Sequence, residues 1–141
     1  MKRFEWVEHP SDIGFRAYGR SLAEAFENAG IALFEIMTDT SKVEPKEERR
    51  IELEAEDEGA LFYDWIDRLL YLHDSEHLLM SKFEVNIAKG KKRLSLAGRA
   101  WGERFNPEKH EQRTAVKAMT YHMMEIKREN ETLYVQAVVD I

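Results

Sequence analysis

Acidic residues near the two ends of the chain are the strongest candidates for chemistry. Asp12 follows a short turn, and Asp140 stands beside the carboxylate of Ile141 after an apolar stretch. Clustered carboxylates need a compensating charge, and oxygen donors suit a hard divalent cation such as Ca²⁺ or Mg²⁺. If the first turn and the last strand meet in the fold, Asp12, Asp140 and Ile141 would form such a site. The alternative is that each acid is simply an exposed turn or terminal residue.

Three basic or ionisable residues accompany these acids. Lys117 is an alternative counter-charge for the carboxylates, and His122 follows five residues later. An odd separation along a strand places two side chains on opposite faces, so Lys117 and His122 would diverge. For His122 the default is an internal, hydrogen-bonded histidine. His9, in the turn before Asp12, is a further candidate for contact with a phosphate or a partner.

Two other segments are strongly charged. Lys89, Lys91, Lys92 and Arg93 place four positive charges within five residues, which could meet a phosphate backbone or an acidic partner. The alternative is a solvated hairpin tip. The segment 44–58 is rich in acids and is expected to form a solvated strand face.

The composition excludes several classes of protein. The 141 residues include 21 Lys and Arg against 27 Asp and Glu, a net charge of −6, which argues against nucleic-acid binding through bulk positive charge. The absence of cysteine removes disulfides, thiolate metal sites and cysteine nucleophiles. Nucleotide-binding glycine loops, the serine-hydrolase elbow and the H-E-x-x-H zinc motif are also missing. No apolar run suggests a membrane span or a signal peptide, so we expect a cytoplasmic protein, and the high charge favours a thermophilic source.

The elements that must position these residues follow from hydrophobic periodicity. A capping box at Ser21 and Glu24 predicts a helix that ends near Thr38, and a second helix is expected from Asp57 through Leu72. Alternating apolar residues predict strands over 3–8, 13–19, 50–55, 83–87, 94–96, 116–126 and 133–139, although 116–126 could also be helical.

This order of elements lacks regular βαβ alternation. It predicts an α+β fold, a single domain over residues 1–141, with a mixed or antiparallel sheet and two helices packed on one face. The three tryptophans, Trp6, Trp65 and Trp101, are expected to anchor the core.

Six segments in order give the chain a resemblance to the archease family. They are H-x-x-D-I-G-F at 9–15, S-L-A-E-A-F at 21–26, L-x-x-x-W-I-x-x-L-L at 61–70, Gly102-Glu103, V-K-A-M-T-Y-H at 116–122, and V-V-D-I at 138–141. The resemblance runs from Phe4 to Ile141.

This resemblance implies an accessory protein of tRNA splicing that is not itself an enzyme. Such a protein activates an RtcB-type RNA ligase, promoting its GTP-dependent guanylylation and multiple turnover, and meets tRNA only indirectly. The family's metal-binding acids correspond to Asp12 and Asp140, and its functional lysine corresponds to Lys117.

Two other functions stay open from the sequence. One, which the resemblance to the archease family also implies, is a chaperone-like modulator of a tRNA cytosine methyltransferase. The other is a stand-alone metal-dependent phosphoesterase that uses Asp12 and Asp140. The phosphoesterase would need an enclosed pocket, and the sequence supplies no obvious nucleophile or second metal set.

Overall fold

The residues that the structure describes form two helices, one short 3-10 helix and eight strands. The structure is a computed structural model and describes residues 1–7 and 12–141. In chain order the elements are β1 (Phe4–Val7), β2 (Asp12–Gly19), α1 (Leu22–Met37), η1 (Thr40–Lys42), β3 (Glu47–Ala55), α2 (Glu58–Glu76), β4 (Leu78–Lys89), β5 (Leu94–Arg104), β6 (Ala118–Met119), β7 (Glu125–Glu129) and β8 (Thr132–Asp140).

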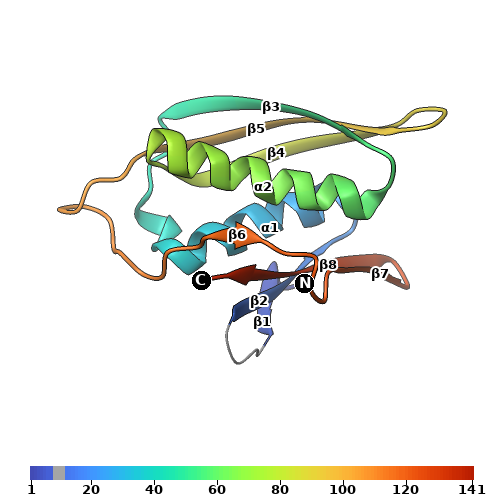
Figure 1. The fold of residues 1–141 in the computed structure, drawn as a ribbon, viewed down its shortest axis with the longest axis horizontal. Coiled ribbons are helices and arrows are strands. Elements are labelled where there is room, and N and C mark those ends of the chain that lie inside the picture. Colours follow the sequence, from blue (N-terminus) through green and yellow to red (C-terminus); the bar gives the residue numbers. More distant parts are fainter. Residues whose placement is uncertain (8–11) are drawn as a thin grey trace.

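The strands make two antiparallel sheets. The five-stranded sheet has the order β1-β2-β8-β6, with β7 also paired to β8, and the three-stranded sheet has the order β3-β5-β4. Figure 1 shows the three-stranded sheet above the helices and the five-stranded sheet below them. Helix α1 contacts β4 of one sheet and β2 of the other, so the helices lie between the sheets.

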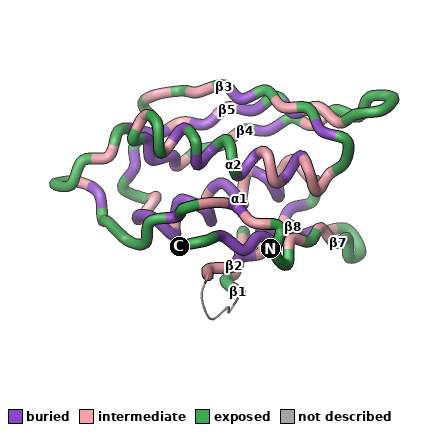
Figure 2. The backbone as a smooth tube through the Cα atoms, in the orientation of Figure 1, coloured by how far each residue is buried: buried purple, intermediate pink, exposed green. Residues whose placement is uncertain are grey.

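The α+β class is therefore confirmed, with a different arrangement of layers from the one expected. The strands divide between two sheets, and the helices do not cover one face of a single sheet. The burial of α1 explains this, because its buried positions extend around most of the helix and include Ala25, Phe26, Ala29, Leu33 and Phe34. A helix with so wide an apolar surface needs covering on more than one side. Figure 2 shows the buried backbone concentrated where helices and sheets face one another.

Local signals set the helix starts correctly. The Ser21 side chain accepts a hydrogen bond from the Glu24 N–H at 3.1 Å, and the Glu24 carboxylate accepts one from the Arg20 N–H at 2.7 Å. Helix α2 begins after Asp57, whose side chain accepts from the Ala60 N–H at 2.8 Å. The bonds to the Glu24 and Ala60 N–H groups satisfy donors that the first turn of a helix leaves without partners.

Long-range pairing moved two strand boundaries. Strand β3 begins at Glu47, before the start of the strand predicted over 50–55, because its residues from Glu47 onward pair with β5 from Gly102 backward. Strand β5 continues to Arg104 for the same reason. The outward positions of β3, including Glu52 and Glu54, are exposed as predicted.

The prediction of one strand over 116–126 was wrong. Only Ala118–Met119 pairs with the end of β8, and Glu125–Glu129 then forms a separate strand along its beginning. Between them Met123 has a φ of 55°, a left-handed conformation that ends regular strand geometry. Periodicity alone does not reveal such a turn.

Of the three tryptophans that were predicted to anchor the core, one does so. Trp65 is fully buried, and its indole N–H donates to the Phe26 carbonyl oxygen at 3.0 Å. Trp6 is 51% exposed. Trp101 is half-buried on the outer face of the three-stranded sheet, between the Lys82 and Arg99 side chains.

A buried ionic cluster joins β5 to the loop that follows it. The Glu103 carboxylate accepts hydrogen bonds from Lys109 Nζ at 3.0 Å and from the Glu44 N–H at 2.8 Å, and lies 3.0 Å from His110 Nε2. His110 Nδ1 accepts from the Asn106 N–H, so Nε2 carries the proton and donates to Glu103. Burial by itself would raise the pKa of Glu103, but the hydrogen bonds from Lys109, Glu44 and His110 outweigh it and lower the pKa to about 2.

This cluster predicts a loss of stability in acid. A depressed pKa means that ionised Glu103 stabilises the fold fully above its ordinary pKa of 4.5, and that this contribution falls away as the pH drops toward 2. The contribution is at most about 3 kcal/mol. Denaturant unfolding of Glu103→Gln between pH 6 and pH 2 should therefore show a flatter pH dependence than the wild type. Glu54→Gln, at an exposed position, is the control and should keep the wild-type slope; equal slopes for both variants would contradict the prediction.

Candidate functional site

Two acidic residues from opposite ends of the sequence lie side by side. Strands β2 and β8 pair antiparallel, and Asp12 is directly opposite Asp140 in their register. Residues paired in this way point to the same face, with Cβ atoms about 4.5–5.5 Å apart. The next pair, Ile13 and Val139, packs toward the core, so the two aspartates are on the outer face of the sheet.

The backbone of Lys117 reaches Asp140 immediately before a third strand, β6. The Lys117 N–H donates to the Asp140 carbonyl oxygen at 2.8 Å, and the next residue, Ala118, is the register partner of Asp140 on β6. Asp140 therefore has Asp12 on one neighbouring strand and Ala118 on the other. Both Lys117 and Asp140 are exposed, while Asp12 is half-buried. The arrangement places the two carboxylates side by side where β2 begins and β8 ends, with the backbone of Lys117 bonded to Asp140.

The carboxylates of Asp12 and Asp140 suit a hard cation, but these side chains alone are too few to complete its coordination. In the described ranges 1–7 and 12–141, no group of three His, Cys, Asp or Glu side chains is placed to hold a metal ion. Asp12 and Asp140 provide oxygen donors, and Ile141 follows Asp140 directly. Ca²⁺ takes six to eight oxygen ligands, so further oxygens from water or from a partner would have to complete its coordination. An ion held here would be accessible from outside the protein.

The structure places His122 in the turn after β6. His122 is exposed, and its N–H donates to Thr120 Oγ1 at 3.2 Å. We expected Lys117 and His122 to lie on opposite faces of one strand. The two residues do not share a strand, because β6 ends at Met119. His9, the remaining predicted contact residue, lies outside the residues that the structure describes.

Sequence reasoning missed the residue that holds this turn against the sheet. Gln136 is 3% exposed on β8, where its Nε2 donates to the Met123 carbonyl oxygen at 2.8 Å and its Oε1 accepts from Arg16 Nε at 2.7 Å. Thr120 Oγ1 donates to the Val138 carbonyl oxygen at 2.7 Å. The sequence did offer one indication of this role, because Gln136 is a single amide within an otherwise largely apolar strand. A buried polar group needs hydrogen-bond partners, so such an amide is expected to bond to a neighbouring segment.

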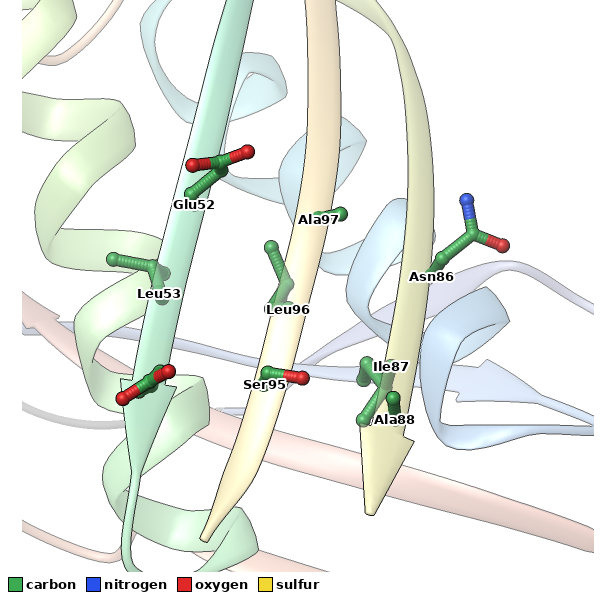
Figure 3. Close-up of a pocket in the computed structure, with 9 residues that line it drawn as sticks. Glu52, Leu53, Asn86, Ile87, Ala88, Ser95, Leu96 and Ala97 are labelled. Carbon is green, nitrogen blue, oxygen red and sulfur yellow. The ribbon is translucent and has the colours of Figure 1, made fainter. Parts of the chain in front are cut away.

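A separate hollow of about 540 Å³ lies on the three-stranded sheet. Figure 3 shows small side chains, Ser95 and Ala97, on its central strand, with Glu52 on one neighbouring strand and Asn86 on the other. The helices separate this sheet from the strands that carry Asp12 and Asp140. The hollow and the aspartates are therefore two distinct places on the molecule.

Among the described residues no helix has the length and apolar character that crossing a membrane would require.

Comparison with known proteins agrees with this fold and sequence. Residues 4–141 match the model of the Archease protein family. The chain is 57% identical to "Protein archease" of Sulfurisphaera tokodaii and 50% identical to that of Methanothermobacter thermautotrophicus, and each alignment covers 100% of both chains. These relatives include thermophilic sources, as the composition suggested.

Two solved structures share the fold. The solution structure of Methanobacterium thermoautotrophicum protein 1598 has 50% identity and a TM-score of 0.90, with 100% of both chains covered. A crystal structure from Thermotoga maritima, described as an archease and possible chaperone, has 23% identity and a TM-score of 0.62, covering 96% of this chain and 94% of the other, and supports the fold alone. The family match and the full-length relatives together establish that this chain belongs to the Archease protein family.

Proposed function

We propose that this protein is an accessory protein of tRNA splicing that activates an RtcB-type RNA ligase. It would promote the ligase's GTP-dependent guanylylation and its multiple turnover. Membership of the archease family supports an accessory role, and the sequence resemblance suggests the partner. The observation that carries the proposal is the direct pairing of Asp12 with Asp140, next to Lys117. It brings two cation-binding carboxylates together where β2 begins and β8 ends, with the backbone of an exposed lysine beside them.

In this proposal Asp12, Asp140 and the Ile141 carboxylate hold a Ca²⁺ or Mg²⁺ ion. The ion would supply positive charge that neutralises phosphate oxygens. The antiparallel register holds the two aspartates on one face, so that the chain does not have to reorganise to bring them together. Lys117 would contact a phosphate or a carboxylate of the partner, with His122 and His9 as further contacts. The exposure of Asp140 and Lys117 supports such a role, because a partner can reach them.

The test is multiple-turnover joining of a cleaved tRNA. An RtcB-type ligase from the same organism is supplied with GTP and a divalent metal ion, with and without this protein. We expect the protein to increase the number of products formed per ligase beyond a single turnover, and to increase the guanylylated fraction of the ligase. An unchanged product yield over a range of protein concentrations would contradict the proposal.

A second candidate, a chaperone-like modulator of a tRNA cytosine methyltransferase, is favoured by the acidic face of β3. Glu48, Glu52 and Glu54 are exposed on the outer face of the three-stranded sheet and could cover a basic, RNA-binding surface. The related Thermotoga protein is described as a possible chaperone. Salt-sensitive binding to the methyltransferase that persists in Asp12→Ala, without any effect on the ligase, would favour this candidate.

A further inference from the structure

The turn between β4 and β5 forms a narrow basic projection, here named the 89–93 tip. Lys89 pairs with Leu94 at the end of the two strands, and the Gly90 N–H donates to the Arg93 carbonyl oxygen at 2.8 Å. Figure 1 shows this hairpin extending beyond the body of the molecule, and Figure 2 shows that it is exposed. All five of its residues are exposed. The tip therefore presents its cations away from the rest of the protein.

None of the four cations of the 89–93 tip forms an ion pair with the described part of the chain. Two arginines of the same sheet are paired: Arg49 lies 2.7 Å from Glu76, and Arg99 lies 2.6 Å from Glu84. The acid that acts electrostatically on Lys89 is Glu58, which is already bound by Arg128 at 2.6 Å. The tip thus keeps its positive charge although the whole chain has a net charge of −6.

The chemistry of the tip favours a phosphate backbone as its partner. The four cations lie within five consecutive residues of one exposed turn between β4 and β5, so they form a compact cluster of positive charge. A nucleic-acid duplex offers a continuous line of charge, about one per 1.7 Å of its axis, whereas protein carboxylates are more scattered. Lysine acts as a compact point charge without strict geometry. The tip has no aromatic residue, so it is suited to backbone contact and not to base stacking.

We propose that the 89–93 tip is a sequence-independent contact for the phosphodiester backbone of RNA. This contact is separate from the Asp12 and Asp140 site and does not depend on the ligase, because the tip belongs to the other sheet. Its role would be to hold RNA beside the protein through charge alone. Affinity should therefore depend strongly on salt and little on base sequence.

The test compares the wild type with the triple variant Lys91→Gln, Lys92→Gln and Arg93→Gln. Fluorescence anisotropy measures binding of a short fluorescein-labelled RNA duplex over a series of salt concentrations. The variant should bind about tenfold or more weakly at low salt, and the slope of log affinity against log salt should fall by about 0.9 per lost contact. Circular dichroism checks that the variant is folded.

A matched control removes three exposed cations elsewhere, through Arg20→Gln, Lys42→Gln and Arg68→Gln. Both variants carry the same net charge, so the control should retain most of the RNA affinity if the tip is the contact. Equal loss in the two variants, or no binding by the wild type, would overturn the proposal. Binding of a labelled polyglutamate peptide as tightly as the RNA duplex would also overturn it, in favour of an acidic protein partner.

Discussion

Replacing Asp140 with asparagine is expected to reduce stimulation of the ligase by about tenfold or more while leaving the protein folded. Asparagine keeps the shape of the side chain, and the Lys117 N–H still has the backbone carbonyl of residue 140 as its acceptor. The substitution removes one of the two charges that β2 and β8 place opposite one another. Multiple-turnover ligation measures the effect on activity. Thermal unfolding of the isolated protein with and without CaCl₂ measures the effect on ion binding. Wild type should gain stability with the ion, and Asp140→Asn should gain much less.

Asp67→Asn is the matched control, because Asp67 is an exposed aspartate on α2, away from the β2–β8 pair. It should stimulate the ligase and respond to CaCl₂ as the wild type does. Full stimulation by Asp140→Asn would remove Asp140 from the proposed mechanism. Normal stimulation together with a lost calcium response would show that the ion is not required for activation. The two readouts therefore separate the metal site from the ligase partnership.

Gly102→Ala is expected to destabilise the fold by more than about 3 kcal/mol. A Cβ atom at this position would lie 1.7 Å from the Leu79 carbonyl oxygen and 2.8 Å from Met80 Cα. Both are backbone atoms of β4, beside the irregular register between Met80 and Lys82, and no side-chain rotation can relieve the overlap. Strands β4 and β5 would have to separate at this point. Equilibrium unfolding in guanidinium chloride measures the change.

The control for this prediction is Gly59→Ala in the first turn of α2. A Cβ atom there would meet only Met124 Cε at 3.4 Å and Asp57 Oδ1 at 3.5 Å, which are ordinary contacts. Alanine also favours the helix over glycine, so the variant should be neutral or more stable by up to about 1 kcal/mol. Similar stabilities for the two variants would mean that β4 and β5 tolerate a side chain at position 102.

Features of the fold that depend on near neighbours could be predicted from the sequence. The starts of α1 and α2 follow from Ser21 and Asp57, because a capping side chain bonds N–H groups two or three residues away. The hairpin at 89–93 follows from alternating apolar residues on both sides of a glycine turn. In each case the physical cause lies within a few residues of its effect.

Features that depend on distant neighbours could not be predicted in this way. Glu47 is in a strand because β5 lies beside it, and the division into two sheets reflects the covering that α1 needs on more than one side. The turn at Met123 exists because Gln136, from a later strand, bonds its carbonyl oxygen. No local pattern contains these contacts.

The candidate site combines both kinds of information. The sequence by itself determined which residues have suitable chemistry, since carboxylates at Asp12 and Asp140 and an amine at Lys117 are properties of the side chains. Only the tertiary structure decided that they meet. The antiparallel register of β2 and β8 brings together two residues that are more than a hundred positions apart, and the backbone of Lys117, just before β6, bonds one of them. Register is set by the burial of alternate residues such as Ile13 and Val139, and a shift of one residue would have turned the aspartates toward the core.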